Sequence, residues 1–247
     1  MPVSISSLSS APLRLNSVAP PAPGPSSALA RGLRSVNNTP QTLATVTRDR
    51  MMVVAPKHLR ADTEWLAANI AQWINRAVDG VAQARRGTVL GANNLASPDL
   101  YVRLVQIWFG DLDAEQFATL ARNLTQMRDV LQHPQSSICL VDAPSNDSQG
   151  FYAQVRGGFN PLRPRLTIEV ADLWRGAGKD DKAQTLFHEL SHRILGTDDL
   201  GRAEGYPATL YGRYNAMLAA EFDPRDALRN AENYGYFIAE CNGLNCK

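Results

Sequence analysis

The stretch Thr185–Asp199, TLFHELSHRILGTDD, decides how the chain is interpreted, because it joins a periodic helix to side chains that bind metals. Its apolar residues recur at intervals of four and predict one buried helix face: Leu186, Leu190 and Ile194. Asp180 or Asp181 is a suitable N-cap residue, and Gly196 is a suitable C-terminal stop. The sequence therefore predicts a helix that ends just before the segment Gly-Thr-Asp-Asp.

The same helix carries His188 and His192 four residues apart, so their imidazoles project side by side and can share one metal ion. Glu189 lies about 100° around the helix from His188, which places its carboxylate beside such an ion as a general base. The alternative is an ordinary polar helix face on which one histidine pairs with the glutamate. A third ligand would separate the two interpretations, because a catalytic zinc takes three protein ligands and leaves a fourth position to water.

No histidine follows His192, so a third ligand downstream has to be a carboxylate. Asp198 and Asp199 follow Gly196 directly, and a glycine turn can fold the chain back toward the ion. Glu221, in a later helical segment, is the more distant candidate. The residues alone do not decide which of these three carboxylates is the third ligand.

Composition narrows the class of protein. The chain has 247 residues, of which 44% are hydrophobic and 20% charged, enough for one sizeable core. A net charge of +1 gives no electrostatic reason to expect a nucleic acid or membrane partner, and no apolar run is long enough to span a bilayer. Three cysteines favour a reducing compartment, with a Cys241–Cys246 bridge left open. His58 and His133 show no ligand spacing and are expected at the surface.

Residues 1–50 are rich in Ser, Pro and Ala, and this composition predicts a disordered leader. The leader lacks the basic start and unbroken apolar stretch of a secretory signal peptide. In composition it resembles the leaders of bacterial type III secreted effectors, which implies export into a host cell. The alternative is a tail that carries no address on a cytoplasmic protein. Residues 51–247 are expected to form one domain.

Within that domain, two stretches have helical periodicity. Apolar residues form one stripe after a cap at Asp62 or Thr63, and a second stripe before the break at His133–Pro134. The stripes consist of Trp65, Leu66, Ile70, Trp73, Ile74, Ala77 and Val81, and of Phe117, Leu120, Leu124, Met127 and Leu131. YVRLVQIWFG, residues 101–110, fits either a helix end or a buried strand. Strands are expected within 136–144, 151–158 and 164–174, and helices within 207–222 and 224–240.

The spaced motifs HELSH, GTDD, LYG and NAENYGYF, with WFG at 108–110, resemble the aspzincin family of metallopeptidases over roughly residues 105–240. That family pairs H-E-x-x-H with G-T-x-D. The resemblance implies that His188, His192 and Asp199 bind one catalytic Zn²⁺ and that Glu189 is the base. It also implies a small zincin domain of α+β class, mainly helical, with a short sheet packed over the active-site helix.

Two departures from the family pattern concern residues downstream of the ligands. The family's tyrosine normally follows the aspartate ligand closely, whereas here LGRAEGYPAT intervenes before Tyr211. Tyr211 is the expected catalytic phenol, and Tyr206 is its rival. Glu232 is a candidate substrate-binding residue or a support for the ligands. Gly235 stands where a second acidic residue is expected, so lysine specificity does not follow from the resemblance.

The function expected is zinc-dependent endopeptidase activity on protein or peptide substrates, in a secreted bacterial effector that acts as a monomer. In this mechanism Glu189 takes a proton from the zinc-activated water, and Tyr211 helps to stabilise the oxyanion. The strand RLTIEV, residues 165–170, could pair with an extended substrate or could be an ordinary core strand. The alternatives are a non-catalytic zinc-stabilised binding module, and a housekeeping or self-processing peptidase.

Overall fold

The computed structural model describes residues 43–48, 51–89, 99–144, 151–155, 165–201, 205–206 and 209–246, all within one unit, Pro40–Lys247. It begins with strands β1 (Leu43–Arg48) and β2 (Met51–Pro56), the short 3-10 helix η1 (Lys57–Leu59) and the long helix α1 (Arg60–Val89). Helices α2 (Leu100–Phe109) and α3 (Ala114–Leu131) follow, and then strands β3 (Ser137–Asp142), β4 (Ala153–Val155) and β5 (Arg165–Val170). The last helices are α4 (Asp172–Gly176), α5 (Lys179–Leu195), α6 (Arg213–Phe222), α7 (Pro224–Ala227) and α8 (Ala231–Cys241).

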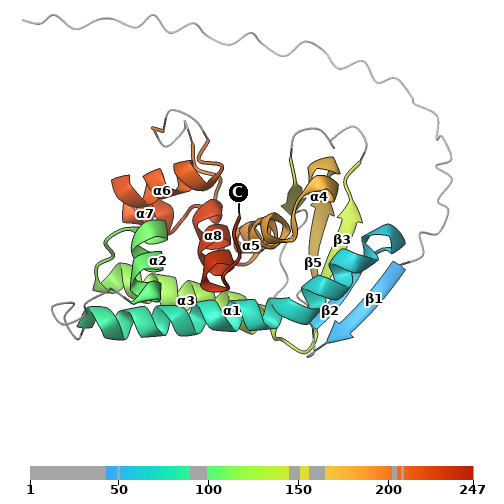
Figure 1. The fold of residues 1–247 in the computed structure, drawn as a ribbon, viewed down its shortest axis with the longest axis horizontal. Coiled ribbons are helices and arrows are strands. Elements are labelled where there is room, and N and C mark those ends of the chain that lie inside the picture. The colour runs from blue at the N-terminus through green and yellow to red at the C-terminus, as the bar shows by residue number, and fades with distance from the viewer. Residues whose placement is uncertain are drawn as a thin grey trace, which may run out of the picture. The chain divides into compact units, whose positions relative to one another are not determined.

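The strands form one five-stranded sheet in the order β1-β2-β3-β5-β4. The inner pairs β2–β3 and β3–β5 are parallel, whereas the outer pairs β1–β2 and β4–β5 are antiparallel. Helix α5 lies between the sheet and α8 (Figure 1) and contacts both β4 and β5. The expected α+β fold, mainly helical with a short sheet against the motif-bearing helix, is confirmed.

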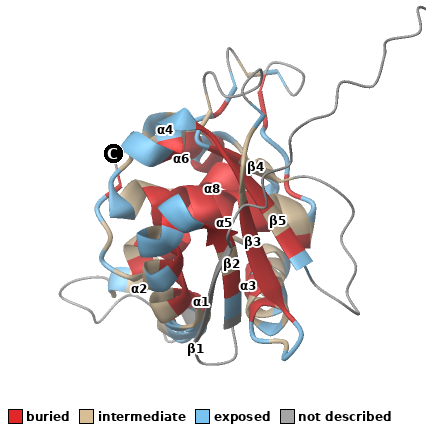
Figure 2. Cartoon of the chain, turned by 90° about the vertical axis from the view of Figure 1, so that its right-hand side faces the viewer, coloured by how far each residue is buried: buried red, intermediate tan, exposed pale blue. Residues whose placement is uncertain are grey.

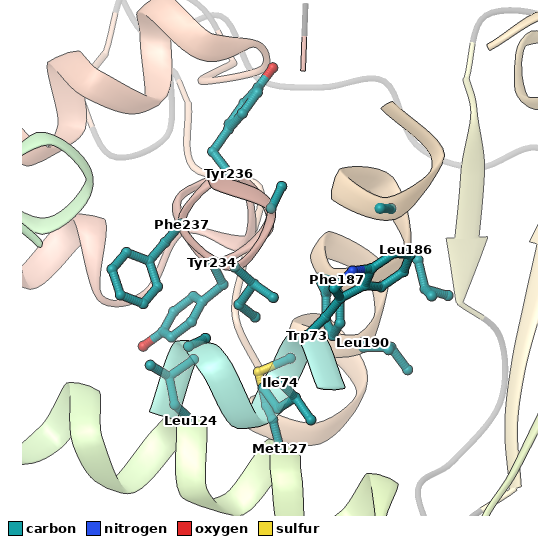
Figure 3. Packing of buried hydrophobic residues seen from close by; sticks show 14 of the residues in the cluster. Trp73, Ile74, Leu124, Met127, Leu186, Phe187, Leu190, Tyr234, Tyr236 and Phe237 are labelled. Carbon is teal, nitrogen blue, oxygen red and sulfur yellow. The ribbon is translucent and has the colours of Figure 1, made fainter. Parts of the chain in front are cut away.

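The core lies where α1, α3, α5 and α8 meet. Both predicted apolar stripes are buried there except Trp65, which is partly buried. Figure 2 shows the buried residues concentrated in β3, β5, α5 and α8. In Figure 3, Leu186, Phe187 and Leu190 of α5 lie beside Trp73 and Ile74 of α1. This packing fixes one face of α5 and leaves another face for the histidines.

The start of the folded unit differs from the expectation. Residues 43–48 form β1 and pair along their whole length with β2, so a domain start at 51 is too late. The alternating sequence LATVTR supplies the β-branched residues that a strand favours. The rest of the expected leader, residues 1–42, lies outside the described residues.

The expected caps of two helices are also wrong. Helix α1 begins at Arg60, so Asp62 and Thr63 lie inside its first turn. The hydroxyl of Thr63 donates to the Leu59 carbonyl, and Asp62 accepts from Lys182 and Trp174. Helix α5 begins after Gly178, and the expected caps Asp180 and Asp181 lie in its first turn. Carboxylates in a first turn still stabilise a helix through its dipole.

Three open points are resolved by the structure. Residues 101–109 lie in helix α2, and the segment expected to form one helix within 224–240 forms α7 and α8 with a bend between them. The described cysteines are free, so Cys241 and Cys246 form no bridge, and the Cys246 thiol donates to the Asp180 carbonyl. None of the helices in the described part of the chain has the length and apolar character needed to cross a bilayer.

Candidate metal centre and active site

Helix α5 presents its two histidines toward one point. The Nε2 atoms of His188 and His192 lie 3.0 Å apart, and Oδ1 of Asp199 lies 3.2 Å from the first and 3.1 Å from the second. Tetrahedral bonds of about 2.0–2.1 Å to zinc would separate two ligand atoms by about 3.3 Å. These three atoms therefore form one face of a tetrahedron that fits Zn²⁺ with little movement, and among the described residues no fourth His, Cys, Asp or Glu joins the group.

The other carboxylates considered from the sequence lie elsewhere. The side chain of Asp198 is exposed and faces Arg229 at 3.5 Å, and Glu221 is exposed on α6. The backbone of Asp198 is held by α8, because its N–H donates to the Arg229 carbonyl and its carbonyl accepts from Ala231. This pairing turns the following residue, Asp199, toward the histidines.

The second nitrogen of each histidine faces an oxygen atom. Nδ1 of His192 donates to the carbonyl of Thr197 at 2.6 Å, and Nδ1 of His188 lies 3.5 Å from Oε2 of Glu232. An acceptor at Nδ1 fixes the tautomer and ring orientation that leave the Nε2 lone pair for a metal. Glu232 is itself held, since Gly212 N–H donates to its Oε1 at 2.9 Å and Gln184 donates to its Oε2.

The charges of the centre are mutually compensating. Burial alone would lower the pKa of His188, but hydrogen bonds to Asp199 and Glu232 raise it to about 10. Burial alone would raise the pKa of Asp199, but its contacts with His188 and His192 hold it well below its usual range. The Asp199 carboxylate is therefore ionised even when no metal ion is bound. A metal that binds here must displace protons from the histidines.

Glu189 lies beside this triangle without being part of it. Its Oε1 is 3.8 Å from Nε2 of His188, and the backbone amide of Val155 donates to its carboxylate. Burial raises the pKa of Glu189 to about 7, against the lowering effect of the two histidines. A carboxyl group with a pKa near neutrality can both accept and release a proton at physiological pH.

The structure distinguishes the two candidate tyrosines. The hydroxyl of Tyr211 donates to Oδ2 of Asp199 at 2.7 Å, and its ring centroid lies 6.1 Å from that of His188. The hydroxyl of Tyr206 instead donates to Asp226, at 2.9 Å, away from the centre. Burial and the bond to Asp199 raise the pKa of Tyr211, so its phenol stays protonated and can donate.

A narrow neck brings Tyr211 back despite the intervening residues. Leu210 N–H donates to the Leu200 carbonyl at 2.7 Å, which pins the two arms of the loop together. At Gly201 a side-chain Cβ would lie 3.0 Å from Cα of Thr209, so the close approach of the arms favours a glycine. The apparent insertion therefore leaves Tyr211 beside Asp199.

The packing of α8 against α5 explains why position 235 is a glycine. A Cβ at this position would lie 2.8 Å from the carbonyl oxygen of Gln184 and 3.3 Å from Cβ of His188. Helix α8 therefore approaches α5 most closely beside the first histidine, where a side chain would not fit. The absence of an acidic residue at 235 follows from this contact.

A cleft of about 590 Å³ opens onto the centre. Its residues come from β4 and the two positions before it, from α5, from the two positions before α6, and from α8. Its lining consists of Phe151, Tyr152, Ala153, Asp181, Gln184, Thr185, His188, Glu189, Tyr211, Gly212, Glu232 and Tyr236. Glu189 and Tyr211 therefore face the same cleft.

Sequence reasoning missed several residues at the centre. The contributing groups are the backbone carbonyl of Thr197, the side-chain amide of Gln184 and the backbone N–H of Val155. None of these residues belongs to a chemically distinctive type. Only Thr197 had a usable signal, since the turn after a histidine ligand commonly supplies a carbonyl to that ligand.

Comparisons with known proteins agree on one family. The family model described as lysine-specific metallo-endopeptidase, the aspzincins, matches residues 99–239. An extracellular protease of Aeromonas hydrophila is 33% identical over 135 residues, covering 53% of this chain and 34% of that protein. A peptidyl-Lys metalloendopeptidase of Pleurotus ostreatus is 31% identical over 134 residues, covering 53% of this chain and 69% of that protein.

Among solved structures, a zinc peptidase from Grifola frondosa has a TM-score of 0.45 and 23% sequence identity, covering 71% of this chain and 94% of that one. The chain spans about a third of the length of the Aeromonas relative that it matches.

Proposed function

The chain belongs to the aspzincin family of zinc metallo-endopeptidases, and from this premise we propose that it hydrolyses peptide bonds in protein or peptide substrates. His188, His192 and Asp199 would hold the single Zn²⁺. The observation that carries the proposal is the triangle of three ligand atoms 3.0–3.2 Å apart, with a buried carboxylate of raised pKa beside it in the same cleft.

When bound, zinc supplies Lewis-acid chemistry that activates a water molecule and polarises the substrate carbonyl. Glu189, buried in the cleft beside the ligand triangle, accepts the proton of the attacking water and passes it to the leaving amine. The Tyr211 phenol, half exposed at the edge of the cleft, would exchange its hydrogen bond to Asp199 for one to the oxygen that gains charge. Glu232 and Thr197 hold the imidazoles in the ligand tautomer.

A substrate strand requires a free sheet edge, and of the two alternatives for residues 165–170 the ordinary core strand agrees with the pairing of β5. Strand β5 pairs with β3 on one side and β4 on the other, so its hydrogen bonds are occupied. Strand β4 is at the end of the described strand order, and Ala153 lines the cleft. We propose that an extended substrate pairs with β4.

The Pleurotus relative is named as a peptidyl-Lys metalloendopeptidase. In this chain, the Glu232 carboxylate already accepts from Gly212 and Gln184 and lies beside His188, and Gly235 has no space for a second acidic side chain. We therefore propose that cleavage does not require lysine.

A non-catalytic zinc module is the rival function. Such a module would normally use four protein ligands and would have no need of a base beside the ion. The full chain, loaded with zinc, should cleave casein, and a chelator should stop it. Glu189→Gln should abolish cleavage while zinc stays bound, whereas Glu221→Gln, a matched change on exposed α6, should cleave like wild type. Full activity of Glu189→Gln would overturn the mechanism.

We also propose that the chain is secreted as an effector. The support is the composition of residues 1–50 and the similarity to a protease named as extracellular. Export measured with and without residues 1–42 tests this proposal: loss of export without the leader is expected, and unchanged export would contradict it. Cleavage of the chain by itself, blocked by Glu189→Gln, would instead favour a self-processing peptidase.

A further inference from the structure

Aromatic rings gather at the part of the cleft formed by β4 and by the residue before α6. Phe151 and Tyr152 precede β4, and Tyr211 precedes α6; all three line the cleft. Tyr152 is 44% exposed and Tyr211 52% exposed. Large rings left open to solvent beside a candidate catalytic centre form an apolar surface that continues directly into that centre.

The cleft residues that lie along α5 and α8 are polar. Thr185, Gln184, Glu232 and the partly buried Asp181 lie along α5 and α8, and their polar groups are engaged at least in part within the protein. Burial of apolar surface against aromatic rings is favourable without any specific hydrogen-bond partner. The available binding free energy for a substrate side chain therefore lies in the rings rather than in the carboxylates.

We infer that Tyr152 is a specificity-determining residue, and that the cleft selects peptides with an aromatic or branched aliphatic side chain next to the scissile bond. The inference rests on the proposed peptidase function and extends it by naming the substrate class. Ala171 N–H donates to the Tyr152 carbonyl at 2.9 Å, so the backbone that carries this ring is fixed to the residue that follows β5.

Leu173 on α4 offers a matched control. It is also 44% exposed and also apolar, but it does not line the cleft. Three variants are compared in a Glu189→Gln background, where peptides bind without being cut: Tyr152→Ala, Tyr152→Phe and Leu173→Ala. The probes are two labelled short peptides that differ only at the residues flanking the central bond, Phe in one and Ser in the other.

The expected result is tighter binding of the Phe peptide than of the Ser peptide. Tyr152→Ala should reduce that preference about three- to tenfold, the loss typical of one aromatic contact. Tyr152→Phe should retain the preference, and Leu173→Ala should leave it unchanged. Equal binding of the two peptides, or the same loss in Leu173→Ala as in Tyr152→Ala, would overturn the inference.

The same variants with Glu189 intact separate the inference from the function on which it rests. Cleavage of the Phe peptide should show a raised KM in Tyr152→Ala with kcat little changed. A protein that prefers the Phe peptide in binding but never cleaves it would refute the peptidase function and leave the inference standing. A protein that cleaves both peptides with equal kcat/KM would refute the inference and leave the function standing.

Discussion

Gly235→Ala tests whether the contact between α5 and α8 holds the metal centre together. The added Cβ would lie 2.8 Å from the carbonyl oxygen of Gln184, and an ordinary contact starts at 3.4 Å. The helices must therefore separate by about 0.6 Å. Because the obstacle is backbone, no rotation of a side chain relieves it, and an overpacked contact of this kind costs roughly 3 kcal/mol.

Part of this cost is regained because alanine is a better helix former than glycine by about 1 kcal/mol. The net destabilisation is then about 2 kcal/mol, which lowers Tm by about 4–8 °C in a domain of this size. The same separation draws Glu232 away from Nδ1 of His188, now 3.5 Å away, so zinc affinity should fall about tenfold.

The measurements are thermal unfolding of the metal-free protein and zinc competition with a chromophoric chelator. Gly176→Ala is the control, because this glycine also lies in a helix, α4, and a Cβ there meets nothing within 4 Å. Gly176→Ala should leave Tm unchanged or raise it slightly. A Gly235→Ala protein as stable as wild type and with the same zinc affinity would refute the reasoning.

Two further variants test the centre itself. Asp199→Asn should weaken zinc binding at least tenfold in the same competition assay, since it removes a charged ligand. Asp198→Asn should bind zinc normally, because the Asp198 side chain faces Arg229. Equal effects of the two changes would contradict the ligand assignment. Tyr211→Phe should lower kcat about 10²-fold with zinc retained, because it removes one donor to the oxyanion. Tyr206→Phe should lose only a hydrogen bond to Asp226 and about 1 kcal/mol of stability. An unchanged kcat in Tyr211→Phe would exclude a catalytic phenol.

The sequence predicted the parts of the fold whose signal is local. Helix α3 has a regular apolar stripe, which was sufficient to place it, and the structure adds a capping box between Asp113 and Gln116. The pair His188 and His192 is local in the same sense, because helix geometry alone brings residues four apart together.

What the sequence could not supply depends on contacts between distant segments. The cap of α1 failed because Asp62 is used 120 residues away by Lys182. The role of Gly235 required the distance between two helices, and the cleft required β4 to lie beside α5. Residues 101–109 are apolar over too short a length for periodicity to separate a helix from a strand.

The hydrogen bond that joins Leu200 and Leu210 has a consequence for the length of the segment between them. Since the neck fixes where Tyr211 returns, the number of residues between Gly201 and Thr209 is uncoupled from the chemistry. Lengthening a closed loop adds only about 0.6 kcal/mol per doubling. A peptide inserted between the two arms is therefore expected to leave Tyr211 beside Asp199.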